Sequence, residues 1–296
     1  MNHSQRFKSQ ENGAGKLKGV LLGSGDRRPT ILKEAERLRP LIENYVDIIG
    51  EDFDFSKELD YSQADLAIVF GGDGSILRSA RQMGCQQLPV LGVNLGKLGF
   101  LADLQSEDLE SALSRIESGK YQIIDHLMIR CQVFENDHLI CDETGLNEVA
   151  IMGGPPFSIQ YIDLYVDAEL ATTYSCDGLI ISTPIGSTAH NLSAGGPILR
   201  KNLQAFVVSP ISPHTLTVRP VVDRAERIYE MVVREPNEST SVVMDGRMLS
   251  QLTSNHRVRV QRADHSFKLV EVSGQGYYRT LREKLGWAGE FNKKTN

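Results

Sequence analysis

The chain has 296 residues, with 32 Lys and Arg against 38 Asp and Glu, so its formal net charge is −6. At roughly 100–200 residues per domain this length predicts two domains. The 41% hydrophobic and 24% charged fractions are those of a globular protein rather than a disordered one. The mildly acidic balance argues against nucleic acid as a partner, because dedicated nucleic-acid binders usually carry a basic surface.

Neither secretion nor membrane insertion is indicated. The polar arm, residues 1–15, lacks the apolar stretch of about 7–15 residues that a secretory signal needs, and no apolar run elsewhere approaches a membrane span. No C-x-x-C pair and no zinc-type spacing occurs among the four cysteines, which are Cys85, Cys131, Cys141 and Cys176. We therefore expect a cytoplasmic protein with reduced thiols and no membrane partner.

Residues 16–104 predict an α/β domain with a Rossmann-like open sheet, because short apolar strands alternate with amphipathic helices. The segment 66–70, Leu-Ala-Ile-Val-Phe, is apolar on both faces, as a central parallel strand requires. Thr30 is the expected cap of the first helix, and Pro40 is expected to interrupt that helix. Further strands are expected at 18–22, 46–49 and 88–93, and a second helix at 76–83.

Residues 105–274 predict a β-rich, β-sandwich-like domain after a short helix at 107–118. Alternating apolar and polar residues, as in 127–133, place one face of each strand in a core. Similar alternation is found at 162–166, 216–218, 258–260 and 267–272. The tail, residues 275–296, has a helical pattern and the only Trp, Trp287, and is expected to pack back on the first domain.

The loop Gly71-Gly72-Asp73-Gly74-Ser75 follows the clearest strand and opens a helix, which is where open α/β sheets bind ligands. Its glycines allow a phosphate to approach the backbone N–H groups, the helix N-terminus adds positive potential, and Ser75 offers a hydroxyl. A carboxylate there suits a divalent cation or the removal of a proton from an attacking hydroxyl, both of which phosphoryl transfer needs. The alternative is an ordinary tight turn in which Asp73 caps the helix.

Two further segments carry polar residues in unusual density. Residues 176–197 run from a buried strand at 179–181 into small and hydroxylated residues, which suit hydrogen bonds to a sugar or a phosphate, unless they form only a connecting loop. Asn147 and Glu148 precede an apolar strand. Adjacent residues on a strand point to opposite faces, so both line one pocket only if the chain bends there.

Together these segments resemble the NAD kinase family. The matching motifs are GGDG at 71–74, N-L-G-x-L-G-F-L at 94–101, L-N-E at 146–148, D-G-x-x-x-S-T-P-x-G-S-T-A at 177–189, S-A-G-G-P at 193–197 and L-R-E-K-L-G-W at 281–287. Diacylglycerol, sphingosine and phosphofructokinase families share GGDG, whereas the long segment after L-N-E is specific.

The resemblance implies an enzyme that transfers the γ-phosphoryl group of ATP to the 2′-hydroxyl of the NAD adenosine ribose. It implies Asp73 as the catalytic base, near a divalent cation such as Mg²⁺ that is held largely through phosphates. The residues implied for the ATP phosphates are Gly71, Gly72, Gly74 and Ser75. Those implied for NAD are Asp73, Gly74, Phe100, Asn147, Glu148, Asp177, Thr188, Ala189, His190, Ser193 and, on a weaker signature, Asp245.

The sequence departs from the family pattern at two positions. His190 stands where the family usually has a Tyr that stacks on adenine, and Ile185 stands where it usually has Thr. Since imidazole also stacks and forms hydrogen bonds, we expect NAD binding with an altered affinity or pH response.

Because GGDG falls in one part of the chain and the other motifs in the second, the active site is expected in a cleft between the domains. The resemblance also implies a homodimer or homotetramer in which a neighbouring subunit completes the NAD pocket. Two alternatives remain open: a lipid kinase that shares GGDG, and a module that senses NAD(H) without turnover. Polyphosphate as donor and NADH as acceptor are also undecided.

Overall fold

The structure is a computed structural model that describes residues 15–96, 99–272 and 277–286. It divides into two compact units, one formed by the chain up to Ile124 together with the chain from Lys268, the other by Asp125–Phe267. Two long strands, β6 (Gln122–Glu135) and β17 (His256–Glu271), contribute residues to both units. The expected polar arm, except Gly15, and Trp287 lie outside the described residues.

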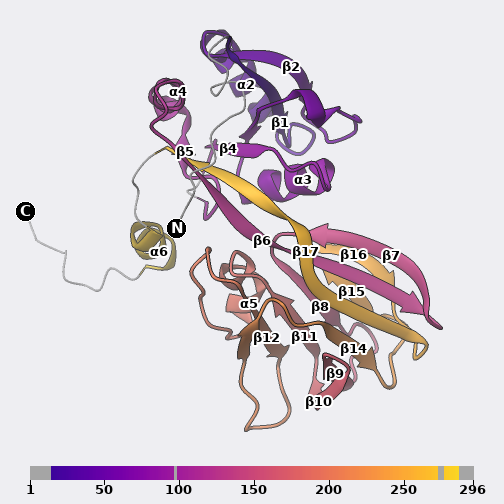
Figure 1. The fold of residues 1–296 in the computed structure, drawn as a ribbon. Coiled ribbons are helices and arrows are strands. Elements are labelled where there is room, and N and C mark those ends of the chain that lie inside the picture. The colour runs from indigo at the N-terminus through magenta and orange to yellow at the C-terminus, as the bar shows by residue number, and fades with distance from the viewer. Residues whose placement is uncertain (1–14, 97–98, 273–276, 287–296) are drawn as a thin grey trace, which may run out of the picture. The chain divides into compact units, whose positions relative to one another are not determined.

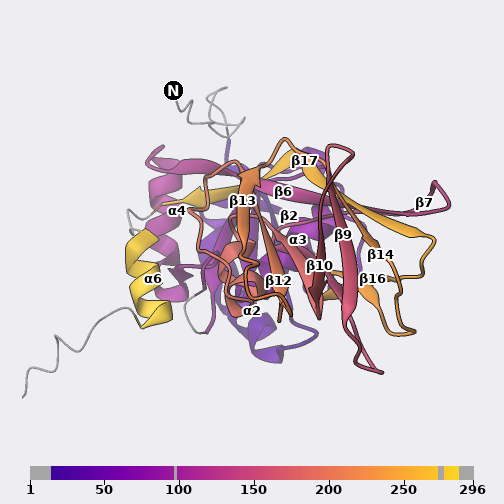
Figure 2. The same cartoon turned by 90° about the horizontal axis from the view of Figure 1, so that it is seen from below.

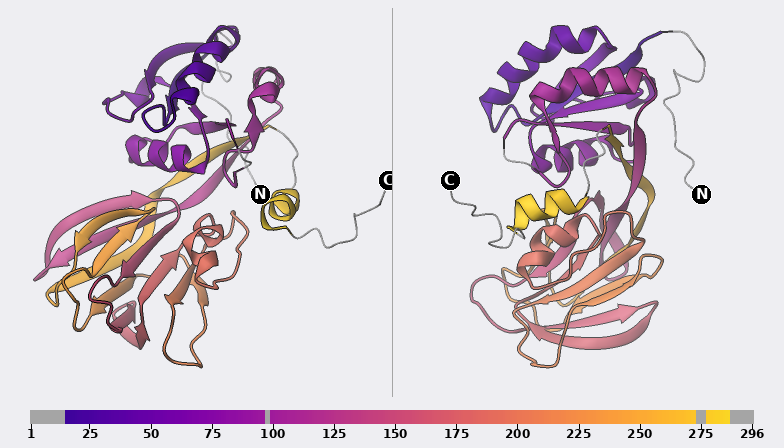
Figure 3. Two further views of the ribbon diagram at one scale, coloured as in Figure 1. Left: turned by 180° about the vertical axis from the view of Figure 1, so that it is seen from behind. Right: turned by 90° about the vertical axis from the view of Figure 1, so that its left-hand side faces the viewer.

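The first unit is a parallel sheet with helices on both faces (Figures 1 and 3). Its strand order is β2-β1-β3-β4, with the end of β17 beside the start of β4 and β5 beside its end. The strands are β1 (Leu17–Gly23), β2 (Val46–Asp52), β3 (Leu66–Phe70), β4 (Pro89–Asn94) and β5 (Leu104–Gln105). The helices are α2 (Pro29–Glu43), α3 (Asp73–Met83), α4 (Leu109–Glu117) and α6 (Tyr277–Leu285), with short 3₁₀ turns η1 (Tyr61–Gln63) and η2 (Ser106–Asp108).

Helix α2 begins and continues differently from the prediction. Arg28 is its N-cap residue and Pro29 takes the first helical position, where a fixed φ and a missing N–H cost nothing, so Thr30 lies inside the helix and the predicted cap is wrong. The helix also runs through Pro40 to Glu43. Leu38 and Ile42 are both buried, and their packing holds the last turn in place despite the hydrogen bond that Pro40 cannot donate.

The core of the first unit extends beyond residue 104, where the sequence analysis ended the α/β domain. Buried residues of α2 and of the sheet form one cluster with α4, whose contribution is Leu109, Ala112, Leu113 and Ile116. These four residues share one face of the helix because they recur at three to four positions. In the structure α4 therefore packs as a third helix of the α/β unit.

The second unit consists of two antiparallel sheets. One has the order β10-β9-β14-β17-β6-β7, and the other β13-β12-β11-β8-β15-β16; β9 with β10 and β12 with β13 are easily followed in Figure 2. The remaining strands are β7 (His138–Gly145), β8 (Glu148–Met152), β9 (Gln160–Val166), β10 (Glu169–Cys176), β11 (Gly178–Ser182), β12 (Ala205–Ile211), β13 (Val221–Arg224), β14 (Tyr229–Val233), β15 (Ser241–Met244) and β16 (Arg247–Gln251). Two short turns of helix follow β11, η3 (Gly186–Thr188) and α5 (His190–Ser193).

Both sheets of the second unit supply one apolar core. Phe206 of β12 and Tyr229 of β14, each from a different sheet, meet edge to face with ring centroids 5.9 Å apart. The predicted fold class, an α/β unit and a β-rich unit, is confirmed. The strand predicted at 216–218 is wrong: this segment is a turn, and Leu216 is 91% exposed. Among the described residues, no helix is long and apolar enough to cross a membrane.

Candidate active site

The GGDG loop follows β3, at the topological switch point of the parallel sheet, where successive strands are added on opposite sides of β1 and β3. The chain moves outward from β1 to β2 and in the opposite direction from β3 to β4, so the carboxyl ends of β1 and β3 flank the position where open sheets bind ligands. Gly71, with φ 129°, donates its N–H to Val93 O at 2.9 Å and turns the chain away from β3. Helix α3 then starts at once, with its N-terminus at this edge.

Asp73 is the first residue of α3, but its side chain does not cap the helix. The N-cap residue is Gly72, and the helix has no capping hydrogen bond from a side chain. Instead the Asp73 carboxylate accepts three backbone N–H groups, from Phe100 at 2.7 Å, Leu101 at 2.9 Å and Ala102 at 3.1 Å. A carboxylate has about four lone-pair positions, so room for one more donor remains.

Gly99 and Asn94 allow the loop at residues 99–102 to adopt its conformation around Asp73. A Cβ at Gly99 would lie 2.1 Å from Asp73 Oδ1 and 3.0 Å from Ala102 O, so only glycine allows this approach. Asn94 is buried; its Nδ2 donates to Ala102 O at 3.2 Å and its Oδ1 accepts from Gly96 N at 2.8 Å. Asn94 lies in the N-L-G-x-L-G-F-L motif, and no role was expected for it from the sequence.

The two loops of this edge are joined by hydroxyls. Ser75 is buried, and its Oγ donates to Ser24 Oγ, in the loop after β1, at 3.0 Å. The Ser75 hydroxyl that was expected to face a phosphate is thus engaged within the protein. Gly74, by contrast, is exposed at the start of α3. Arg27 and Arg28 are exposed cations in the loop after β1, which the sequence analysis had not singled out.

In the second unit the chain bends at Leu146 and Asn147, between β7 and β8. A bend here is the condition under which the side chains of Asn147 and Glu148 can line one pocket. Asp245 holds this bend: its carboxylate accepts the N–H groups of Leu146 and Asn147, each at 2.8 Å, and of Glu148 at 3.3 Å. Asp245 and Gly246 have φ 48° and 76° and join β15 to β16, as an Asp-Gly hairpin turn requires. The three predicted residues therefore form one cluster.

Glu148 is an acid of this cluster whose pKa is raised. Burial, and secondarily the negative charge of Asp245, raise the pKa of Glu148 to about 8, although the backbone N–H of His190 opposes this shift with a hydrogen bond. One carboxyl oxygen, Oε2, is buried without a hydrogen-bond partner. Such an atom is costly unless something that the protein binds completes it.

The segment after β11 returns to the same bend. Thr183 donates its N–H to Asn147 O at 2.8 Å and its hydroxyl to Leu146 O. Gly186 packs so closely that a Cβ there would lie 2.2 Å from Asn147 O. Thr188, Ala189 and His190 follow as half-buried residues. The segment is thus built into the unit and is not a simple linker.

Asn191 fixes the S-A-G-G-P loop and was missed. It is buried, its Nδ2 donates to Ser187 O and Pro197 O at 3.1 Å each, and its Oδ1 accepts from Ser209 at 2.7 Å. A Cβ at Gly196 would lie 2.0 Å from Asn191 Oδ1, which explains the glycine. Ser193 remains exposed.

Asp177 is not part of the cluster in the second unit. It precedes β11, whereas Thr183 follows it, and five strand residues at about 3.3 Å each separate the two ends. Its exposed carboxylate lies 3.3 Å from His214 Nε2.

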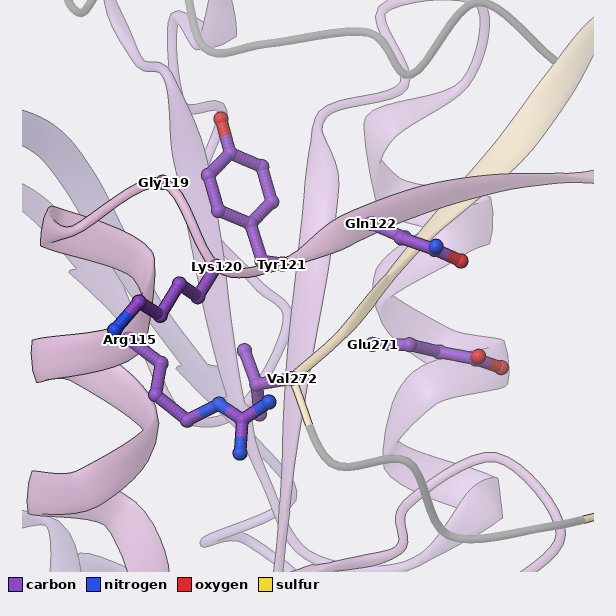
Figure 4. A pocket seen from close by; sticks show the side chains of 7 residues that line it. All are labelled: Arg115, Gly119, Lys120, Tyr121, Gln122, Glu271 and Val272. Carbon is purple, nitrogen blue, oxygen red and sulfur yellow. The ribbon is translucent and has the colours of Figure 1, made fainter.

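Phe100 is half-buried, and Lys284 Nζ of α6 lies 5.3 Å from its ring centroid, a cation–π contact within the first unit. A cavity of about 340 Å³ is lined by residues that include Thr30, Asn94 and Gly96. Another cavity, of about 430 Å³, lies at the end of α4 near Arg115 and Tyr121 (Figure 4). None of the predicted site residues lines the latter cavity.

Comparison with known proteins identifies the family. Residues 31–121 match the model of the ATP-NAD kinase N-terminal domain, and residues 146–272 match that of the ATP-NAD kinase C-terminal domain. An NAD kinase from Rhodopirellula baltica is 57% identical over 270 residues, covering 91% of this chain and 86% of the relative. One from Geotalea daltonii is 37% identical, covering 86% and 89%.

Two solved structures share the fold. The yeast NADH kinase complexed with NADH has a TM-score of 0.80 at 22% identity and covers 95% of this chain and 91% of that one. An NAD kinase from Archaeoglobus fulgidus in complex with ATP has a TM-score of 0.66 at 25% identity and covers 90% and 99%. The two family models and the relatives that span most of the chain show that this chain belongs to the NAD kinase family.

Proposed function

We propose that the protein transfers the γ-phosphoryl group of ATP to the 2′-hydroxyl of the adenosine ribose of NAD, giving NADP and ADP. The observation that carries this proposal is the Asp73 carboxylate, held at the sheet edge by three N–H groups at the N-terminus of α3. The 57% identity to an NAD kinase supports the choice of substrates. The comparisons give no support to the lipid kinase alternative.

In this proposal Asp73 acts as the general base. Its remaining lone pair accepts the proton of the 2′-hydroxyl while the 2′-oxygen forms a bond to the γ-phosphorus and the bond to the bridging oxygen of ADP breaks. A positioned base contributes about 10²–10⁴-fold to such a step. The N–H groups of Gly72, the N-cap residue, and of Asp73 and Gly74 in the first turn of α3 face the phosphates and offset their charge.

The NAD site in this proposal takes its remaining contacts from the bend and the segment after it. Asn147, Glu148, Thr188, Ala189, His190 and Ser193 contact the dinucleotide, and Asp245 acts through the bend that it holds. His190 replaces an adenine-stacking tyrosine in this assignment.

A divalent cation, Mg²⁺, completes the proposal. Among the residues that the structure describes, no group of three or more His, Cys, Asp and Glu side chains is arranged to hold a metal ion. In the proposal the ion is held largely by the substrate phosphates, with Asp73 as the carboxylate near it. When bound, the ion neutralises charge on the transferring phosphoryl group.

We also infer a homo-oligomer. Asp177 stands a strand's length from the cluster around Asn147, so it reaches bound NAD most simply in the site of a neighbouring subunit. Light scattering during size exclusion is expected to give at least twice the mass of the chain. A monomer at the concentration of the activity assay would rule this inference out.

The activity itself is tested by a coupled assay of NADP formation from NAD, ATP and Mg²⁺. NADP is expected, with no phosphorylation of diacylglycerol or sphingosine under the same conditions. Binding of NAD without turnover under varied metals would favour a sensing module, and lipid phosphorylation without NADP would favour the lipid kinase alternative.

A further inference from the structure

Glu148 is a buried acid with an unused oxygen. Its side chain belongs to a residue that is 7% exposed, at the start of β8, directly after the bend that Asp245 holds. The backbone N–H of His190 bonds to its carboxyl group, while Oε2 is buried and meets no partner. If the carboxyl group of Glu148 were ionised, the negative charge on Oε2 would be buried without a hydrogen-bond donor.

Among the residues that the structure describes, no cation offsets a negative charge on Glu148. Asp245, in the turn after β15, repels a second negative charge. Across β11 the paired residue is the buried Ser182, whose hydroxyl donates to backbone oxygens. From α5, His190 offers its backbone N–H. Arg247 of β16, the strand beside β15, is 3.1 Å from Glu143 of β7 and forms an ion pair with it.

We propose that Glu148 works as a neutral carboxylic acid and donates a hydrogen bond from Oε2 to an uncharged acceptor oxygen of NAD, a ribose hydroxyl or the nicotinamide amide oxygen. Oε1 then accepts the His190 N–H, and Glu148 adds no negative charge beside Asp245. This assignment rests on the proposed function for the identity of the ligand.

Neutrality of Glu148 has a physical consequence for a chain whose substrates are anions. A second buried carboxylate beside Asp245 would repel the pyrophosphate of NAD, whereas a carboxylic acid does not. It also converts Glu148 from an acceptor into a donor, which selects ligands that present an oxygen acceptor at this position. Glu148 is thus a residue for dinucleotide recognition, and Asp245 positions it.

The proposal is tested with three variants. Glu148→Gln keeps a donor and cannot ionise, Glu148→Asp keeps the acid but withdraws it by one methylene group, and Glu169→Gln removes an exposed acid of β10 as a control. The KM for NAD is measured between pH 6 and pH 9.5 with saturating ATP and Mg²⁺.

In the wild type, the KM for NAD is expected to rise above pH 8, by about tenfold for each pH unit once the acid has ionised. The KM of E148Q is expected not to vary with pH over this range, whatever its value at pH 7, and E169Q is expected to follow the wild type. E148D is expected to have a KM at least about tenfold above that of the wild type at pH 7, because its proton no longer reaches the ligand.

Two measurements without turnover separate this proposal from the proposed function. The infrared difference spectrum of wild type minus E148Q at pH 7 is expected to contain a protonated carboxyl band, and no such band for E169Q. E148Q is also expected to be more stable than the wild type, by a margin that grows from pH 5 to pH 8, because only the unfolded wild type releases the Glu148 proton there.

A carboxylate band at pH 7, or a KM for NAD in E148Q that rises with pH as in the wild type, would overturn the proposal. If the wild type made no NADP, the proposed function would fall, while the infrared band and the stability margin would still decide the state of Glu148.

Discussion

Asp73 in the first unit and Asp245 in the second each hold a loop through hydrogen bonds to their carboxylates. Each accepts three backbone N–H groups from a loop distant in sequence, the first from 100–102 and the second from 146–148. Hydrogen bonds to a charged group contribute about 1.5–3 kcal/mol each. Each loop is therefore held in one conformation by a single carboxylate.

The approach of the 99–102 loop to Asp73 gives a prediction at the level of one atom. Gly99→Ala adds a Cβ at 2.1 Å from Asp73 Oδ1, so the loop or the carboxylate must move. We expect kcat for NADP formation to fall by at least about tenfold, as misplaced catalytic groups do. Gly96→Ala is the matched control, because its Cβ would meet ordinary contacts at 3.9 Å or more. Equal losses in the two variants would contradict this explanation.

At the scale of elements, the loop between β2 and η1 is fastened to α3. Asp52 ends β2 and is fully buried; its carboxylate accepts the N–H groups of Phe55 and Lys57 at 2.8 Å each and Nε2 of Gln82 at 2.7 Å. These hydrogen bonds outweigh burial, which acts in the opposite direction, and lower the pKa of Asp52 to about 2. Phe55 has φ 59°, a conformation that these bonds stabilise.

Asp52→Asn is expected to destabilise the protein by about 2 kcal/mol at pH 7, since charge-assisted bonds are lost. Because the folded-state pKa is lowered, the stabilisation is complete above about pH 4 and disappears as the pH falls through 2. The check is urea unfolding of D52N and of Asp47→Asn, an exposed acid of the same strand, at pH 7 and pH 3. A D52N deficit no larger than that of D47N at pH 7 would contradict the argument.

Most elements of the first unit follow from local pattern. The segment 66–70 forms β3 as predicted, because an apolar run next to Gly-Gly leaves few alternatives. The start of α2 was mispredicted because Pro29 suits the first helical position better than Thr30 suits a cap. The strand at 216–218 was mispredicted because alternation alone does not supply a pairing partner.

The candidate site was predictable as a set of motifs but not as a set of contacts. Asp73 was singled out from its place between a buried strand and a helix, whereas Asn147 and Glu148 were assigned through the family resemblance. The roles of Asn94, Asn191 and Ser24 depend on hydrogen bonds to residues that lie up to 51 positions away, which no local pattern contains. For the same reason the Asp245 carboxylate could be named but not connected to residues 146–148.

At the scale of the whole molecule, a net charge of −6 must be reconciled with anionic substrates. Global attraction does not bring such substrates to the protein, so local features must do so. The start of α3 and the exposed Arg27 and Arg28 provide positive potential at one edge of the sheet. A metal ion that arrives with the nucleotide would provide the rest.

This view predicts that the metal and the nucleotide bind together. Mn²⁺, as a paramagnetic substitute for Mg²⁺, is expected to bind weakly to the protein alone and tightly in the presence of ATP and the protein, because the proposed ion takes most of its ligands from the nucleotide phosphates. Electron paramagnetic resonance of free Mn²⁺ measures this. Stoichiometric tight binding without nucleotide would contradict it.

The most direct test of the account is the rate of phosphoryl transfer by Asp73→Asn. Single-turnover formation of NADP is measured with NAD and ATP above their dissociation constants for each variant, and thermal unfolding confirms that the variant is folded. We expect a rate at least about 100-fold below the wild type, because an amide does not accept the 2′-hydroxyl proton. A rate within about tenfold of the wild type would show that Asp73 is not the base.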